Sequence, residues 1–141
     1  SILNYTAGKL KLGVQNQYSY TQTITLSSNT SNDLLSIGKQ VIYVPLHKNL
    51  NKLFLAFKGF RFNYAVNYFG LRHTTNDNIY SKALAPYLLH DLEIFKKIDF
   101  KRRSIFTKAS ILNLFNNSYE GLGNRPMPGR AFYLTFVFKF T

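Results

Sequence analysis

The chain has 141 residues, of which 45% are hydrophobic and 16% aromatic, and it contains no cysteine. This composition excludes a disordered chain, a disulfide framework and a metal site built from thiolates, and the lack of any run of about 18 apolar residues excludes a membrane-spanning helix. The net charge of +12 leaves three interpretations open: a nucleic-acid partner, an anionic membrane surface, or a fragment whose charge is balanced elsewhere in a larger protein.

The first predicted element is a strand at residues 9–21 (KLKLGVQNQYSYT). Every second residue from Leu10 to Tyr20 belongs to one set, in which three aliphatic residues are followed by Asn16 and two tyrosines, whereas the residues between them are polar or glycine. Successive side chains of a strand point to opposite faces, so this pattern predicts one apolar and one polar face. In a soluble sandwich the polar face would meet water, and in an outer-membrane barrel it would line the lumen.

Residues 22–46 are rich in Thr, Ser and Asn and predict a long loop, with at most a short strand at residues 40–44. A loop of this length in a compact domain is usually functional. Two strands are predicted next, at residues 52–58 and 60–69, with a tight turn at Lys58 and Gly59 between them.

Residues 70–85 predict a second polar loop, and residues 87–96 (YLLHDLEIFK) fit two patterns. As a helix, this segment would carry an apolar stripe of leucines and Phe95, with Pro86 in its first turn. As a strand, it alternates through Leu88, His90 and Leu92. The strand is the preferred prediction because its neighbours are predicted strands.

The remaining elements are a short basic turn at residues 97–101, a strand at 103–115, a loop rich in Asn, Gly and Pro at 116–129, and a final strand at 130–140. Along the final strand, large apolar residues occupy every second position: Phe132, Leu134, Phe136, Phe138 and Phe140. The eight steps from the first to the last of these rise about 26 Å along a strand, or about 20 Å after a tilt near 40°. That length nearly matches the apolar band of an outer-membrane barrel.

The six predicted strands are joined by alternating long and short connections. Outer-membrane barrels have long loops on the outside and short turns on the periplasmic side, so the fold class predicted is all-β, an antiparallel transmembrane β-barrel. Six strands are fewer than the roughly eight that close such a barrel. We therefore expect the chain to be the C-terminal part of a larger protein and not to fold alone.

Residues 113–140 resemble the C-terminus of TonB-dependent outer-membrane transporters. That family ends in Asn-Leu-Phe-Asn, a nearby Tyr, a loop closing on Pro-Gly-Arg and an alternating aromatic strand. Residues 38–51 (GKQVIYVPLHKNLN) are similar to the approach to an earlier strand of the same family, through Tyr43, Val44, Pro45 and His47. The matching C-terminal positions are Asn113, Leu114, Phe115, Asn116, Tyr119, Pro128, Gly129 and Arg130.

The resemblance implies a barrel of about 22 strands that is plugged by an N-terminal domain. This chain would supply the last six strands, and the plug and the segment that binds TonB would lie outside it. The form RPMPGR looks closer to siderophore, haem or cobalamin transporters of Bacteroidetes type than to the glycan-importing branch that pairs with a surface lipoprotein. Phe136, Phe138 and Phe140 resemble the signal read by the barrel-assembly machinery, although Thr141 follows the aromatic residue that usually ends the family.

Other site chemistries find weaker support in the residues. Nucleic-acid binding would use the basic turn and its neighbouring Phe95 and Phe100, a metal site would need three histidines that lack paired-ligand spacing, and acid–base chemistry would need Asp91 and Glu93. We expect no catalysis, no cofactor, no metal and no nucleic-acid partner. The residues concerned are Lys96, Lys97, Lys101, Arg102 and Arg103 for nucleic acid, and His47, His73 and His90 for metal.

The predicted function is therefore the wall and outer loops of an active transporter in the outer membrane of a Gram-negative bacterium. Its partners would be the rest of the barrel and its plug, TonB, the barrel-assembly machinery, outer-membrane lipid and lipopolysaccharide, and a surface lipoprotein if the glycan-importing branch applied. The family motif is expected to shape the strand ends and last loop, with Arg130 pairing with a lumen carboxylate. The alternatives are a fragment of a passive porin-like barrel and a soluble basic β-domain that binds nucleic acid. The candidate substrate contacts in the outer loops are Arg72, His73, Asp77 and Arg125.

Overall fold

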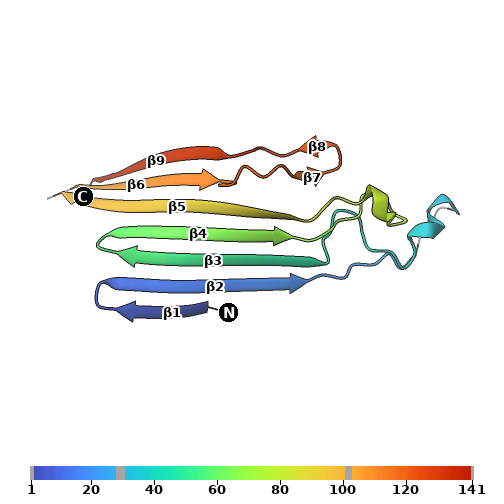
Figure 1. Ribbon diagram of the computed structural model, residues 1–141, viewed down its shortest axis with the longest axis horizontal. Coiled ribbons are helices and arrows are strands. Elements are labelled where there is room, and N and C mark those ends of the chain that lie inside the picture. Colours follow the sequence, from blue (N-terminus) through green and yellow to red (C-terminus); the bar gives the residue numbers. More distant parts are fainter. Residues whose placement is uncertain (1, 28–30, 101–102, 141) are drawn as a thin grey trace.

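The computed structural model describes residues 2–27, 31–100 and 103–140, and its regular structure is mostly antiparallel strands. Seven strands form one sheet in which each strand pairs with the next, and a small hairpin of two further strands lies between the last two (Figure 1). The sheet order is β1 (Ile2–Ala7), β2 (Leu10–Tyr20), β3 (His47–Phe57), β4 (Phe60–Phe69), β5 (Tyr87–Phe100), β6 (Arg103–Leu112) and β9 (Ala131–Phe140). The small hairpin pairs β7 (Glu120–Leu122) with β8 (Arg125–Pro126), and two short 3-10 segments, η1 (Ser31–Ser36) and η2 (Tyr80–Lys82), lie in the longer connections.

The alternation of long and short connections is confirmed. Residues 21–46, 70–86 and 113–130 make long connections at one end of the sheet, which we call the loop end (Figure 1). The opposite end, which we call the hairpin end, has short turns. One of them is the predicted turn at Lys58 and Gly59, where φ is +46° and +79°; two positive φ values suit the right-handed twist of a two-residue hairpin. The preference for a strand at residues 87–96 is also confirmed.

Several predicted boundaries were wrong, and each for a physical reason. β1 was not predicted because it has only six residues, and Ile2 interrupts the polar set that alternates with Leu3, Tyr5 and Ala7. β3 begins at His47, whereas the prediction began at residue 52. The first half of the strand was missed because His47, Asn49 and Asn51 occupy its otherwise apolar side and interrupt the alternation. No strand forms at residues 40–44, where only one isolated bridge joins Ile24 to Gln40.

The remaining boundary errors concern β5 and β6. β5 continues through the predicted basic turn to Phe100, and residues 101 and 102 lie outside the described residues, as does Thr141. β6 ends at Leu112 and not at residue 115, because Asn113 adopts a positive φ of +50° that no strand continues through.

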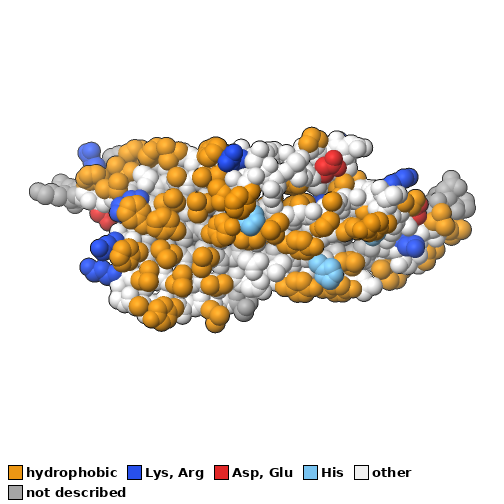
Figure 2. All heavy atoms as spheres, in the orientation of Figure 1, with side chains coloured by type: hydrophobic (Ala, Val, Ile, Leu, Met, Phe, Trp, Pro, Cys, Tyr) orange, Lys and Arg blue, Asp and Glu red, His pale blue; other side chains and the backbone are white. Residues whose placement is uncertain are grey.

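The register gives the sheet one apolar and one polar face. On the apolar face, the pairings align Tyr5, Leu12, Leu55, Phe62, Ile94, Ala109 and Leu134 in one row across all seven strands. Hydrophobic side chains spread over the strands in Figure 2. On the polar face, Lys11, Arg61 and Lys108 occupy one row, separated by Ala56 and Phe95.

The sheet has almost no core of its own. Among the described residues, Leu84 is the one buried hydrophobic side chain, whereas Phe132 is 69% exposed and Phe138 is 61% exposed. β1 and β9 each pair with one neighbour, so the sheet does not close on itself within the described residues. Its apolar face therefore requires a covering that these residues do not supply. None of the helical segments in the described ranges has the length and apolar character to cross a membrane.

Candidate functional site

The apolar face changes character along the strands. Near the hairpin end it consists mainly of aliphatic and phenylalanine side chains, with Lys96 among them. Near the loop end of β2 to β5 it carries amides, tyrosines and histidines that bond across strands. Asn16 Nδ2 donates to Asn49 Oδ1 at 2.9 Å and to Asn51 Oδ1 at 2.5 Å. The Tyr18 hydroxyl lies 2.7 Å from His47 Nδ1. These polar groups satisfy one another where the apolar zone ends, as suits a boundary between an apolar and a wet environment.

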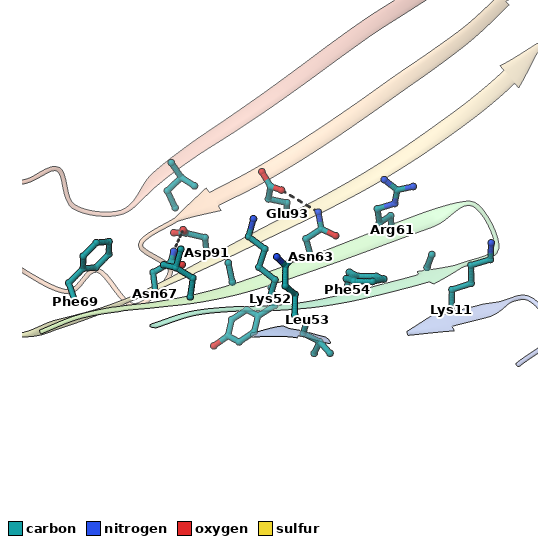
Figure 3. A pocket seen from close by; sticks show the side chains of 16 residues that line it. Lys11, Lys52, Leu53, Phe54, Arg61, Asn63, Asn67, Phe69, Asp91 and Glu93 are labelled. Atoms are coloured by element: carbon teal, nitrogen blue, oxygen red, sulfur yellow. Dashed lines mark hydrogen bonds between the residues drawn. The ribbon is translucent and has the colours of Figure 1, made fainter. Parts of the chain in front are cut away.

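The polar face carries an open groove of about 750 Å³ along β2 to β5 (Figure 3). Asn63 Nδ2 donates to Glu93 Oε2 at 3.4 Å, and Asn67 Nδ2 donates to Asp91 Oδ2 at 3.3 Å. Lys108 Nζ forms an ion pair with Glu93 Oε1 at 2.5 Å. The groove is therefore a hydrophilic wall whose carboxylates are already bonded to neighbouring side chains.

Three further cations and the ring of Phe54 are among the side chains that line this groove. Lys11, Lys52 and Arg61 form no ion pair with any described carboxylate, so they leave an excess of positive charge on the polar face. The ring of Phe54 lies over Gly13 on the neighbouring strand, and a Cβ placed on Gly13 would be 1.9 Å from Phe54 Cζ. Position 13 is therefore filled by the side chain of its cross-strand partner.

At the loop end, residues 21–46 and 70–86 are held together by Gln40 and Asn78. The backbone N–H of Gln40 donates to Asn78 Oδ1 at 2.8 Å, and Asn78 Nδ2 donates to the backbone oxygen of Gln40 at 2.9 Å. The buried Gln40 side chain in turn accepts from the backbone N–H of Thr23 and donates to the backbone oxygen of Thr21. Side-chain amides thus replace the strand ladder where the chain leaves the sheet.

Residues 70–86 and 113–130 are joined by Arg72. This side chain is 4% exposed, and its guanidinium donates to the backbone oxygen of Glu120 at 3.0 Å and to that of Ala85 at 2.9 Å. It also lies over the ring of Tyr87, 4.7 Å from the centroid. Arg72, a candidate substrate contact by sequence, is therefore used inside the protein as a tie between two connections.

The first half of the family motif ends β6 and fixes the chain that follows. Asn113 is 4% exposed, and its amide bonds twice to the backbone of Asn117: Oδ1 accepts from the N–H, and Nδ2 donates to the oxygen, both at 2.9 Å. The backbone N–H of Asn113 donates to Asp91 Oδ1 at 2.9 Å. The backbone N–H of Leu114 donates to the oxygen of His90, and the ring of Phe115 lies edge-on to the His90 ring at 4.7 Å.

The second half of the motif closes the last connection. Asn116 has φ +56°, and its Oδ1 accepts from the backbone N–H of Arg130 at 2.8 Å. A Cβ on Gly129, which follows Pro128, would lie 2.7 Å from that Oδ1, so the approach suits glycine. Arg130 Nη1 lies 3.5 Å from the backbone oxygen of Leu114, where the sequence predicted a carboxylate partner. Tyr119 packs on Tyr87, with ring centroids 4.6 Å apart.

The other predicted site residues are dispersed. His73 and Asp77 are half-buried in the same connection as Arg72, whereas Arg125 is exposed on β8. Phe136 and Phe138 are exposed on the apolar face of β9; Phe140 ends the strand, and its side chain lies outside the described residues. Asp91 and Glu93 share the polar face, as predicted.

Comparisons with known proteins assign no relationship. The chain matches no protein-family model and no curated protein. The functional argument therefore depends on the sequence motif and on the geometry of the two faces and two ends.

Sequence reasoning missed the residues that tie the loop end together. Gln40 and Asn78 are 38 positions apart in the chain and belong to no periodic pattern. The one available signal is the residue type of Asn78: asparagine tolerates the positive φ of +57° that it adopts, and its amide can bond to a passing backbone. The sequence contains nothing that would have named Gln40 as its partner.

Proposed function

We propose that this chain is part of the wall of a TonB-dependent transporter in the outer membrane of a Gram-negative bacterium. It supplies the last strands of a barrel of about 22 strands and three of its outer connections. The transporter imports a scarce, bulky substrate of the siderophore, haem or cobalamin class. The plug and the segment that binds TonB belong to other parts of the protein.

The observation that carries the proposal is the exposed apolar face on a sheet without a core. A soluble protein rarely exposes an apolar patch of more than a few hundred Å², and here apolar rows cross seven strands. The nine steps from the first to the last residue of β9 rise about 30 Å, or about 23 Å at a tilt near 40°, which is close to the height of the apolar band of an outer-membrane barrel. Lipid would cover this face, and the polar face would line the lumen.

The geometry at the motif supports the transporter over other barrels. The side-chain amides of Asn113 and Asn116 bond to the backbone, and the close approach at Gly129 suits glycine. These residue types therefore have a structural role at the positions where the family motif contains them. A passive porin-like barrel would share the two faces and the alternating connections. The difference lies in the plug and in the need for TonB.

Alternate-residue labelling of β9 tests the membrane placement. The chain contains no cysteine, so single cysteines can be introduced at Phe136 and Val137 in the full-length protein, after replacing any cysteine elsewhere in it. We expect a cysteine at 136 to react with a lipid-soluble maleimide and one at 137 to react with a water-soluble maleimide from the lumen. Equal reaction of both positions with the water-soluble reagent, in protein recovered without detergent, would overturn the proposal.

Energy dependence separates active from passive transport. Uptake of iron–siderophore, haem and cobalamin should be measured in cells with and without an uncoupler of the proton-motive force. We expect uptake of one of these substrates to depend on this gene and to stop when the uncoupler is added. Uptake of small solutes that continues unchanged with the uncoupler would instead identify a passive barrel.

A further inference from the structure

Two lysines lie at the hairpin end, where the β3–β4 hairpin ends beside β5, and no carboxylate of the described residues forms an ion pair with either of them. Lys96 belongs to the apolar face: it pairs with Phe60 across the β4–β5 ladder, and Ile94 and Ile98 flank it on the same side of its strand. Lys58 is exposed in the turn between β3 and β4. The ion pairs of the described residues are Lys97–Asp99 and Lys108–Glu93, so neither includes Lys58 or Lys96.

Both ammonium groups are held at the tip of the same hairpin. Lys96 Nζ lies 3.7 Å from the centroid of the Phe60 ring and 3.5 Å from the backbone oxygen of Lys58. Lys58 Nζ lies 5.2 Å from the centroid of the Phe57 ring. The aliphatic stem of Lys96 therefore follows the apolar surface while its charged end reaches the turn, which is how a lysine at a membrane boundary places its charge.

We infer that Lys58 and Lys96 bind the phosphate of an anionic phospholipid whose acyl chains lie on the apolar face. This inference rests on the proposed function, because it requires the apolar face to lie in a membrane. Two cations beside exposed Phe57 and Phe60 are complementary to a lipid, which has a negative headgroup next to apolar chains. A soluble anion would match the charges but would leave the adjoining rings uncovered.

The surrounding charges favour the same partner. Lys9 lies in the neighbouring turn between β1 and β2, and Arg61 and Lys97 are close to the same hairpins on the polar face. Glu93 and Asp99 each lie three positions from Lys96 in the sequence, and both are engaged by other residues: Glu93 by Lys108 at 2.5 Å, and Asp99 by Lys97 at 2.6 Å and by Ser104 at 2.8 Å. The field at this edge is therefore positive, and the leaflet that meets the hairpin end would be enriched in anionic lipid around the protein.

The test compares lipid retention by native mass spectrometry. The full-length protein is reconstituted in nanodiscs containing equal amounts of phosphatidylglycerol and phosphatidylcholine, and the preference for phosphatidylglycerol is measured for the wild type and for Lys58→Gln/Lys96→Gln. Each lysine near the membrane surface is expected to contribute about fivefold, so the preference of the double variant for phosphatidylglycerol should fall by roughly 25-fold. Lys58→Arg/Lys96→Arg, which retains both charges, should retain most of it.

The control removes two charges from the loop end, through Lys39→Gln/Lys82→Gln, and should leave the preference unchanged. An unchanged preference in Lys58→Gln/Lys96→Gln, or an equal loss in the control, would overturn the lipid site. Displacement of the lipid by millimolar inorganic phosphate would also overturn it, since the site would then recognise a free anion. These outcomes leave the proposed function intact, whereas failure of the wild type to insert into nanodiscs would overturn both.

Discussion

The hairpin end and the loop end of this sheet satisfy the hydrogen bonds of their backbone groups in different ways. At the hairpin end, the ladder continues to the last residues of each strand, and a turn such as Lys58–Gly59 leaves few backbone groups to satisfy. At the loop end, long connections leave the ladder, and buried polar side chains take its place. A sheet without a core is therefore rigid at one end through its backbone and at the other through a few amides and one guanidinium.

The charges of the two ends differ in the same way. Arg72 at the loop end is buried, bonded to two backbone oxygens and stacked on Tyr87. Lys58 and Lys96 at the hairpin end contact aromatic rings and a backbone oxygen, without a carboxylate. The comparison teaches that a cation bonded to the backbone of two connections acts as a structural tie, whereas a cation beside exposed aromatic rings is available to an external partner.

Replacing the buried guanidinium should have the largest effect on the loop end. Arg72→Met removes the two hydrogen bonds that the buried guanidinium donates to the backbone oxygens of Glu120 and Ala85, so we expect the free energy of unfolding to fall by about 3–4 kcal/mol. The measurement is the midpoint of thermal unfolding of the full-length protein in detergent, followed by its heat-modified mobility. Arg125→Met removes an exposed guanidinium from the neighbouring connection and should change the midpoint little. Similar midpoints for the two variants would contradict the role of Arg72 as a tie.

The amide that ends β6 should have the next largest effect. Asn113→Ala removes two hydrogen bonds to Asn117 and places an alanine at φ +50°, so we expect a cost of about 2–3 kcal/mol. Asn113→Gly also loses the bonds but tolerates the backbone angle, and it should recover part of that cost. Chemical unfolding of the full-length protein would measure both. If glycine proved no better than alanine, the backbone angle would not be part of the explanation.

The exposed ion pair at the hairpin end should have the smallest effect. The Lys97 and Asp99 side chains are 49% and 59% exposed, and water screens such a pair, so Asp99→Asn should change the free energy of unfolding only slightly. The same unfolding assay, repeated at high salt, should show a still smaller difference between the variant and the wild type. A loss comparable to that of Arg72→Met would show that the hairpin end also depends on side-chain ties.

Most of the sheet could be predicted because alternation is a local property. β2, β4 and β9 each separate large apolar from other residues at every second position, and their predicted bounds agree with the structure to within one residue. The first half of β3 was not predicted because Asn49 and Asn51 occupy positions where the alternation requires apolar residues. In the sheet they lie opposite Tyr18 and Asn16 of β2. The partner strand explains those asparagines, and a single segment read alone does not contain that information.

The candidate site was predicted less completely, because its contacts join distant segments. The motif residues Asn113, Asn116 and Gly129 were named from resemblance, but their amide contacts depend on how the chain returns after the last connection. Arg72 was predicted to face a substrate because it lies in a polar loop, and its burial depends on Glu120, 48 positions away. Lys96 was named among the basic residues for nucleic acid, although the alternation of the predicted strand puts it on the same side as Leu92; its pairing with Phe60 shows that this side is the apolar face.

The pairing of Gly13 with Phe54 also limits how this sheet can change over evolutionary time. Because the ring of Phe54 occupies the volume of any side chain at position 13, a larger residue there first requires a smaller one at position 54. The two positions are therefore expected to change together in descendants of this gene, and in a set order. A lineage that reduces Phe54 gains freedom at position 13, whereas a lineage that enlarges Gly13 first passes through a strained sheet.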